Sequence, residues 1–200
     1  MTNRLESQTP WVVGGPALLL AAAVTCACAL HIAQAQACGT ERWPVKVGTD
    51  QDAGSVDIIP RLASVQILSA VPPPAHPKLR NSTRYPLELK TYTITGTVQL
   101  VRLEADDDYH VVISDGHSAM IVAFPLPACA AGSPFQPLIA AVRARIEAKM
   151  GGALTAEGQS LSPNWTATVT GIGFFDDLHG QAGVARNGVE LHPVLDVSFR

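Results

Sequence analysis

The sequence predicts a mainly β protein, a five-stranded OB-fold-like barrel with one helix and an irregular N-terminal extension. From residue 90 onward the predicted elements are three strands, one helix and two strands, which is the order of an OB-fold. The first strand also shifts the parity of its apolar side chains, and such bends are needed to close a small barrel. An open α+β sheet crossed by one helix is the alternative architecture.

The first predicted strand, "KTYTITGTVQLVRLE", alternates apolar residues with threonines. Ile94 and Val98 share one face, but further along the apolar positions move to Val101 and Leu103. A strand repeats every two residues, so this shift requires a bulge or a sharp bend. Next come "YHVVISD" and "AMIVAFP", separated by the turn "DGHS", which predict the second and third strands.

The segment "SPFQPLIAAVRARIEAKMGG" predicts the helix, with Ser133 as its cap and Gly151 at its end. Arg143 is expected on its exposed side. Its apolar stripe is predicted to consist of Leu138, Ile139, Val142, Ile146 and Met150. The last two strands are "NWTATVTGIGFF" and "GVELHPVLDVSF". Strict alternation puts one apolar face of the final strand at Val189, Leu191, Leu195, Val197 and Phe199.

The chain divides into three parts. Residues 1–37 are predicted to be a signal peptide, because the apolar run "WVVGGPALLLAAAVTCACAL" is followed by "AQAQA", which offers cleavage after Ala35 or Ala37. An uncleaved membrane helix is the alternative. Residues 38–90 form a Pro-rich extension, and residues 91–200 form the OB-fold-like domain. The expected location is extracytoplasmic, either periplasmic or secreted, with no membrane span after cleavage.

The cysteines agree with export. Cys26 and Cys28 lie in the apolar run, which leaves Cys38 and Cys129 as one pair in a chain bound for an oxidising compartment. We therefore predict a disulfide between Cys38 and Cys129.

Three motifs, "CGTERWPVK", "DDDYH" and "ELHP", carry a resemblance to a group of uncharacterised exported bacterial proteins. The resemblance extends over most of the chain after the predicted cleavage site. It implies export, and it transfers no activity.

The stretch "FFDDLHGQAGVARNGVELHP" concentrates carboxylates and histidines. With a histidine of the second strand, it supplies the ligand or metal candidates His110, Asp176, His179, Glu190 and His192. Imidazole and carboxylate together suit a divalent metal ion such as zinc, manganese or iron, although no tighter metal motif is present. The alternative is a solvated hairpin that turns at "NG". The "DDD" run is either a solvated turn or a calcium loop, and it lacks the usual calcium-loop spacing.

The composition and the missing motifs exclude several classes of function. The net charge is -3 and the basic residues form no dense run, so nucleic acid is not an expected partner. No nucleophile elbow or phosphate-binding loop is present. We predict an exported, non-catalytic module that binds a small molecule, an ion or an envelope protein. The alternative is a metal-dependent, phosphodiesterase-like hydrolase that uses the Asp/His/Glu cluster. No specific cofactor is predicted beyond this divalent metal ion.

Overall fold

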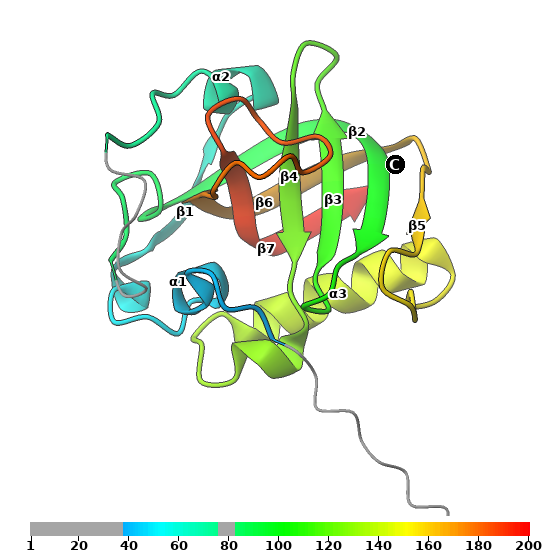
Figure 1. Ribbon diagram of the computed structural model, residues 1–200, viewed down its shortest axis with the longest axis horizontal. Helices are drawn as coiled ribbons and strands as arrows, with labels where there is room; N and C mark the ends of the chain where they lie inside the picture. Colours follow the sequence, from blue (N-terminus) through cyan, green and yellow to red (C-terminus); the bar gives the residue numbers. More distant parts are fainter. Residues whose placement is uncertain (1–37, 76–82) are drawn as a thin grey trace, which may run out of the picture. The chain divides into compact units, whose positions relative to one another are not determined.

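The computed structural model describes residues 38–75 and 83–200, so the predicted signal peptide and part of the Pro-rich connector lie outside the described residues. A closed five-stranded barrel forms its centre (Figure 1). The barrel strands are β2 (Lys90–Leu103), β3 (Tyr109–Ser114), β4 (Ala119–Phe124), β6 (Trp165–Phe175) and β7 (Val189–Phe199). They pair in the order β2-β3-β4-β7-β6-β2, with β4 and β7 parallel. The predicted OB-fold-like barrel is confirmed. In the described residues, no helix is long and apolar enough to cross a membrane.

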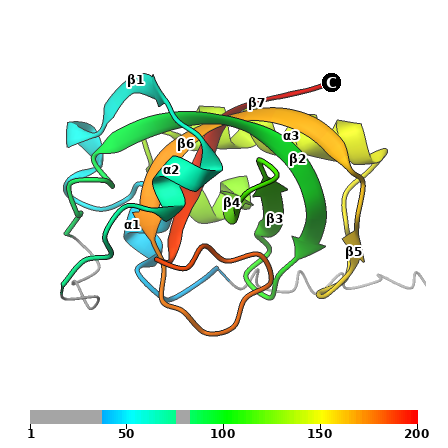
Figure 2. The same cartoon turned by 90° about the horizontal axis from the view of Figure 1, so that it is seen from above.

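Strand β2 is the long strand that closes the barrel. Figure 2 shows it arching over the sheet, with β3 and β6 as its barrel neighbours. Its register against β3 shifts between Val98 and Leu100, which confirms the predicted bulge. At Gly96 an added Cβ would lie 2.5 Å from the Ser114 carbonyl oxygen, so the close approach of β3 requires glycine. Two further strands, β1 (Asp57–Leu62) and β5 (Ser160–Leu161), also pair with β2.

The extension before the barrel contains short elements packed on the barrel. They are the helix α1 (Trp43–Val47), the 3₁₀ turn η1 (Ala53–Ser55), strand β1 and the helix α2 (Val65–Ser69). Ser64 caps α2, because its Oγ accepts a hydrogen bond from the Ile67 N–H at 3.1 Å. Two buried ion pairs, Arg42–Glu88 and Arg84–Asp50, join parts of this segment.

The single long helix, α3 (Gln136–Met150), ends as predicted but begins later. Gly151 has φ +82, and the Gly152 N–H donates to the Glu147 carbonyl. The predicted cap is wrong. Ser133 lies in the turn after η2 (Pro127–Ala130), where its Oγ accepts from the Phe135 N–H, and no side chain caps the helix.

The packed face of α3 also differs from the predicted stripe. Ile139, Val142 and Ile146 are buried, whereas Leu138 is 46% exposed. Arg143, expected to be exposed, is buried. Its guanidinium donates to the Phe124 carbonyl and lies 3.4 Å from the centre of the Tyr109 ring. These contacts with other elements compensate the cost of burying the charge of Arg143. The helical repeat of the sequence does not contain this information.

The apolar side chains form two clusters. One fills the barrel and includes Leu191, Val194 and Val197. The second lies outside the barrel and consists of Trp43, Val47, Ala53, Val56, Ala130, Phe135, Ile139, Ile172 and Leu195. The second cluster joins α1 and α3 to the outer side of β6 and β7.

Strand β7 does not keep the strict alternation that its sequence suggests. Its register against β6 shifts on both sides of the pair Gly171–Val194. These irregularities turn Val194 into the barrel and Leu195 outward, so the prediction that Leu191 and Leu195 share a face is wrong.

Replacing Leu195 with alanine is expected to lower the free energy of unfolding by about 2–3 kcal/mol, because it opens a cavity in the second cluster. Leu195 is 6% exposed, whereas Leu178 is 58% exposed. Leu178→Ala is therefore the control, with an expected change within about 0.5 kcal/mol. Urea denaturation measures both variants. Equal stabilities of the two would contradict the placement of Leu195.

Candidate functional site

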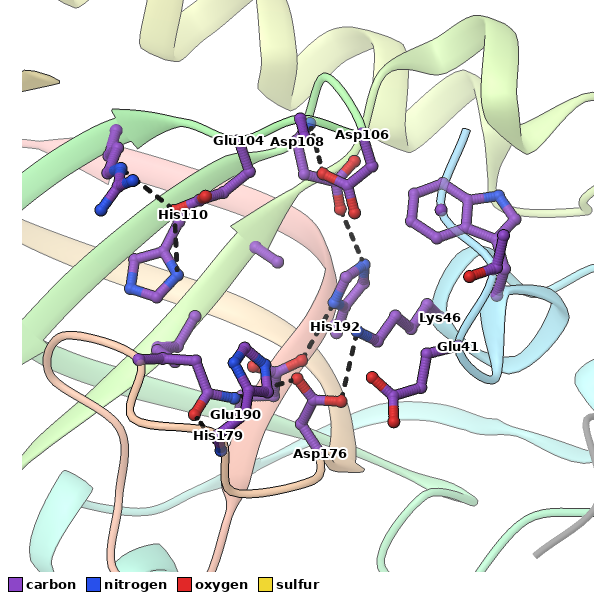
Figure 3. A pocket seen from close by; sticks show the side chains of 18 of the residues that line it. Glu41, Lys46, Glu104, Asp106, Asp108, His110, Asp176, His179, Glu190 and His192 are labelled. Carbon is purple, nitrogen blue, oxygen red and sulfur yellow. Dashed lines mark hydrogen bonds and ion pairs between the residues drawn. The ribbon is translucent and has the colours of Figure 1, made fainter. Parts of the chain in front are cut away.

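A cavity of about 630 Å³ opens on the outer face of the barrel. Its floor comes from β3, β4 and β7, and its walls come from the segment 38–46 and the loops 104–108 and 176–188 (Figure 3). The lining includes all five residues proposed from the sequence, His110, Asp176, His179, Glu190 and His192. The fold thus brings the candidates together in one hollow.

His192 lies at the centre of the cavity floor between two carboxylates. Its Nδ1 is 3.0 Å from Glu190 Oε1, and its Nε2 is 3.2 Å from Asp108 Oδ2 (Figure 3). All three side chains are buried. The rings of Trp43 and Phe174 meet the imidazole edge-on, at centroid distances of 6.3 and 5.8 Å. The predicted pairing of Glu190 and His192 is seen here, and its partner Asp108 comes from the loop after β2.

The two carboxylates keep His192 charged. Burial alone would lower the pKa of His192, but the pairings with Asp108 and Glu190 outweigh it and raise the pKa to about 9. At neutral pH the ring is therefore an imidazolium. An imidazolium has no free nitrogen lone pair, so in this state it neither ligates a metal ion nor accepts a proton.

Asp108 is a buried carboxylate without a good hydrogen bond. It is 4% exposed, and within the described part of the chain neither of its oxygens has a hydrogen-bond partner. The contact of Asp108 Oδ2 with His192 Nε2 at 3.2 Å does not have ideal hydrogen-bond geometry, but the two groups are each other's partners in a buried ion pair. Asp108 Oδ1 has no hydrogen-bond partner among the described residues, and burying such an oxygen costs free energy.

A second ion pair lines the opposite wall. Lys46 on α1 lies 3.2 Å from Asp176 Oδ1, at the start of the loop 176–188. Burial acts to lower the pKa of Lys46, but the charges of Glu190 and Asp176 raise it overall. The pKa of Asp176 is also raised, by burial and by Glu190, despite the lysine. Lys46 is therefore cationic at neutral pH.

Carboxylates outnumber cations in this cavity. The six acidic residues of the lining are Glu41, Glu104, Asp106, Asp108, Asp176 and Glu190, and the cations are Lys46, Arg102 and the protonated His192. Burial and the neighbouring Asp108 raise the pKa of Asp106. A hydrogen bond with Asp177 and burial raise the pKa of Glu41. In both cases neighbouring carboxylates add to the upward shift of the pKa, and Lys46 partly offsets it.

The other two histidine candidates also line the cavity, and the His110 imidazole holds the loop 176–188. His110 Nε2 is 2.8 Å from the Ala182 carbonyl oxygen, which fixes the loop to β3. The His179 N–H donates to Gln181 Oε1 within the loop. Among the described residues, no group of three or more His, Cys, Asp or Glu side chains is arranged to hold a metal ion.

The loop also corrects the predicted turn. Gly188 is at the base of the loop, where its carbonyl accepts from the Asp176 N–H at 2.8 Å. Asn187 Nδ2 donates to the carbonyls of Leu68 and Val71, at the end of α2. The predicted turn at residues 185–188 is present, because the Gly188 N–H donates to the Ala185 carbonyl at 2.9 Å, but it lies at the base of the loop and not at its tip. Asn187 and Gly188 anchor a long loop over the cavity.

Sequence reasoning missed the wall residues that complete the site. Asp106 and Asp108 lie in the "DDD" run, which resembles a solvated turn, and Trp43 and Lys46 lie in "RWPVK". The disulfide between Cys38 and Cys129 is confirmed, and it fixes the start of this wall. The sequence did contain one indication of this wall: Trp43 and Lys46 are three residues apart and follow closely after the predicted disulfide cysteine Cys38.

Comparisons with known proteins add little. No family model matches the chain, and no curated protein matches it significantly. Among solved structures, it is similar to a chain described as a putative aspartyl-tRNA synthetase from Leishmania major Friedlin, with 13% sequence identity and a TM-score of 0.40. The match covers 72% of this chain and 21% of that chain, so this protein spans about a fifth of the other. A likeness at this level supports no inference about function.

The charge on His192 predicts how stability depends on pH. A pKa raised in the folded state stabilises the fold below the unfolded value near 6.5, and this contribution is lost as pH rises towards about 9. We expect the His192 contribution to the free energy of unfolding to fall by about 3 kcal/mol across this window. NMR titration of the imidazole, with urea denaturation at each pH, measures both quantities. A midpoint near 6.5 for His192 would contradict the assignment.

Proposed function

We propose that this protein is an exported, non-catalytic binding module that holds a small molecule in the cavity beside His192. One observation carries the proposal: a cavity of about 630 Å³ lies over a buried charged cluster in which His192 contacts Asp108 at 3.2 Å and Glu190 at 3.0 Å. The cavity has the size of an ordinary small-molecule site.

The position of the cavity supports this proposal. OB-folds bind their ligands over the second and third barrel strands, between the loop joining strands one and two and the loop joining strands four and five. In this chain those elements are β3 and β4 with the loops 104–108 and 176–188, and they all contribute to the lining. The same fold hosts many functions, so the class of ligand has to be inferred from the residues that line the cavity.

The lining favours binding over catalysis. A general base needs a neutral imidazole, whereas Asp108 and Glu190 raise the pKa of His192 to about 9 and favour the imidazolium. Lys46 is paired with Asp176 and cationic, so it is a poor nucleophile. The excess of carboxylates also repels phosphate groups, which makes nucleic acid an unfavourable occupant.

Blocking the cavity tests the proposal. Ala105 is exposed at the cavity wall, and Ala156 is an exposed alanine in a turn elsewhere. Small probes (a hexose, an amino sugar, a short diol and a carboxylic acid) are titrated while backbone amide shifts are recorded by NMR. We expect at least one probe to shift the amides of residues 105–108 and 190–192, and Ala105→Trp to remove this response while Ala156→Trp keeps it. No response from any probe, or the same response in both variants, would overturn the proposal.

Export is part of the proposal, supported by the apolar run and the two small-residue sites that follow it. We expect the exported product to begin at Gln36 or Cys38, because cleavage follows Ala35 or Ala37. N-terminal sequencing of the protein recovered from outside the cytoplasm checks this start. A product that keeps Met1 and sediments with membranes would show that the run is an uncleaved anchor.

A further inference from the structure

We propose that two copies of this chain associate through an exposed apolar patch on β1 and α2. The patch consists of Ile58, Ile59, Leu62 and Ile67. The partner is a second copy in the antiparallel orientation, so that Asp57 of one copy faces Arg61 of the other. None of these residues lines the cavity, so the inference is independent of the proposed function.

The patch concentrates apolar side chains that are open to solvent. Six large apolar residues are exposed in the part of the chain that the structure describes, and four of them belong to the patch. These four are between 62% and 90% exposed. Figure 2 shows β1 and α2 on the same side of the barrel. Single exposed apolar residues are common on protein surfaces, whereas a group of them is typical of an interaction site.

An irregularity in β1 turns the two isoleucines of the patch outward. On β1, Asp57 lies opposite Lys90 of β2. The next paired residue, Arg61, lies opposite Tyr92, so four steps along β1 match two steps along β2. The surplus residues cannot follow β2 and arch away from the barrel. The side chains of Asp57 and Arg61 close the base of this arch, with Oδ2 and Nη2 2.8 Å apart.

The arch does not suit the addition of another strand. Among the described strands, β1 pairs with β2 alone, which leaves its other edge unpaired. Pro60 on this strand has no N–H, and the Ile59 N–H already donates to Asp57 Oδ1 at 3.0 Å. Both features remove donors that an added strand needs. A partner therefore contacts the apolar side chains of the patch.

The charges beside the patch are self-complementary. Asp57 and Arg61 are each about half-exposed, so both can reach a partner. The Ile59 N–H and the Arg61 guanidinium lower the pKa of Asp57, which is ionised at neutral pH. A two-fold axis near Ile59 places Asp57 of each copy opposite Arg61 of the other. The apolar residues then meet at the centre and the charges form the rim, as in other protein interfaces.

A lipid surface fits the patch less well. Apolar surfaces that enter a membrane are usually flanked by an excess of lysine and arginine. Here Arg61 is paired with Asp57. Lys90, which also lies near Asp57, is offset by Asp115, whose carboxylate accepts from the Gln66 N–H at the start of α2. These charges cancel, so they do not attract an anionic membrane.

Sedimentation velocity at rising concentration tests the association, with the processed protein that lacks the apolar run. We expect a monomer–dimer equilibrium, and we expect Leu62→Asp to weaken the dimer at least about tenfold. Leu62 is 90% exposed, so this change leaves the fold intact. Leu178→Asp, at an exposed leucine outside the patch, is the control and is expected to leave the dimer unchanged. Wild-type protein that is still monomeric at about 1 mM, or equal association of the two variants, would overturn the proposal.

Two charge reversals test the antiparallel orientation. Asp57→Arg and Arg61→Asp each put like charges opposite one another in a dimer of identical copies, so each variant alone is expected to associate at least about tenfold more weakly. An equal mixture of the two restores opposite charges and is expected to recover the dimer. A mixture that associates no better than either variant alone would contradict this orientation. Binding of the wild-type protein to neutral phospholipid vesicles, without a dimer in solution, would assign the patch to a membrane and overturn the proposal.

Discussion

Replacing Glu88 with alanine is expected to lower the free energy of unfolding by about 3–5 kcal/mol, the usual cost of removing one partner of a buried ion pair. Glu88 is fully buried and receives both arms of the Arg42 guanidinium, at 2.8 and 2.7 Å. It also accepts from the backbone N–H groups of Tyr85 and Phe175. Its loss leaves a buried guanidinium and two N–H donors without this acceptor.

A surface ion pair is the control for Glu88. Arg145 and Asp196 are paired, but more than half of each side chain is exposed, so Asp196→Ala is expected to cost less than about 1 kcal/mol. Urea denaturation of both variants gives the comparison. Glu88→Gln, which keeps the shape and loses the charge, is the substitute if Glu88→Ala does not fold. A cost for the Glu88 variant no greater than that of Asp196→Ala would show that the pair contributes little.

Removing the Cys38–Cys129 bridge is expected to lower the free energy of unfolding by about 4 kcal/mol, because the bridge closes a long loop and restricts the unfolded chain. The two cysteines are separated by 91 positions in the sequence. Trp43 Nε1 also donates to the Cys129 carbonyl at 3.3 Å, so the native contact between the two segments has a second support. We therefore expect the variant with serine at both positions to fold and to be less stable.

The reductant response provides the check on this bridge. Wild-type protein should lose stability when a thiol reductant is added, whereas the variant with Ser at positions 38 and 129 should not respond. If oxidised wild type and the double variant unfold at the same urea concentration, the bridge does not stabilise the fold.

Most of the barrel could be predicted from local patterns. The parity shift within β2 predicted the bulge near Leu100, and the paired glycines at 151 and 152 predicted the end of α3. Both signals are local, because a strand bulge and a left-handed helix end depend on neighbouring residues. The helix start and its packed face were not predicted. Arg143 is buried because Phe124 and Tyr109, both from other elements, receive it.

The site was predicted only in part, because contacts between distant segments also determine which of its residues are buried. Glu190 and His192 could be placed on one face because they are two residues apart on a strand. Asp108 could not be distinguished from a solvated aspartate, since its buried partner His192 comes from β7, far away in the sequence. Charge and spacing suggested a metal ligand at His192, whereas the two carboxylates around it make it an imidazolium.

The sequence by itself determined the order of the elements, the bend in the first barrel strand and the one available cysteine pair, because these follow from periodicity, glycine positions and counting. Tertiary structure alone decided which face Leu195 occupies, how Arg143 is satisfied, and that Lys46, Asp108 and His192 line one cavity. The physical reason is that closing the barrel brings segments far apart in the chain into contact. Burial and pairing, which set charge state and hydrogen bonding, exist only once those contacts form.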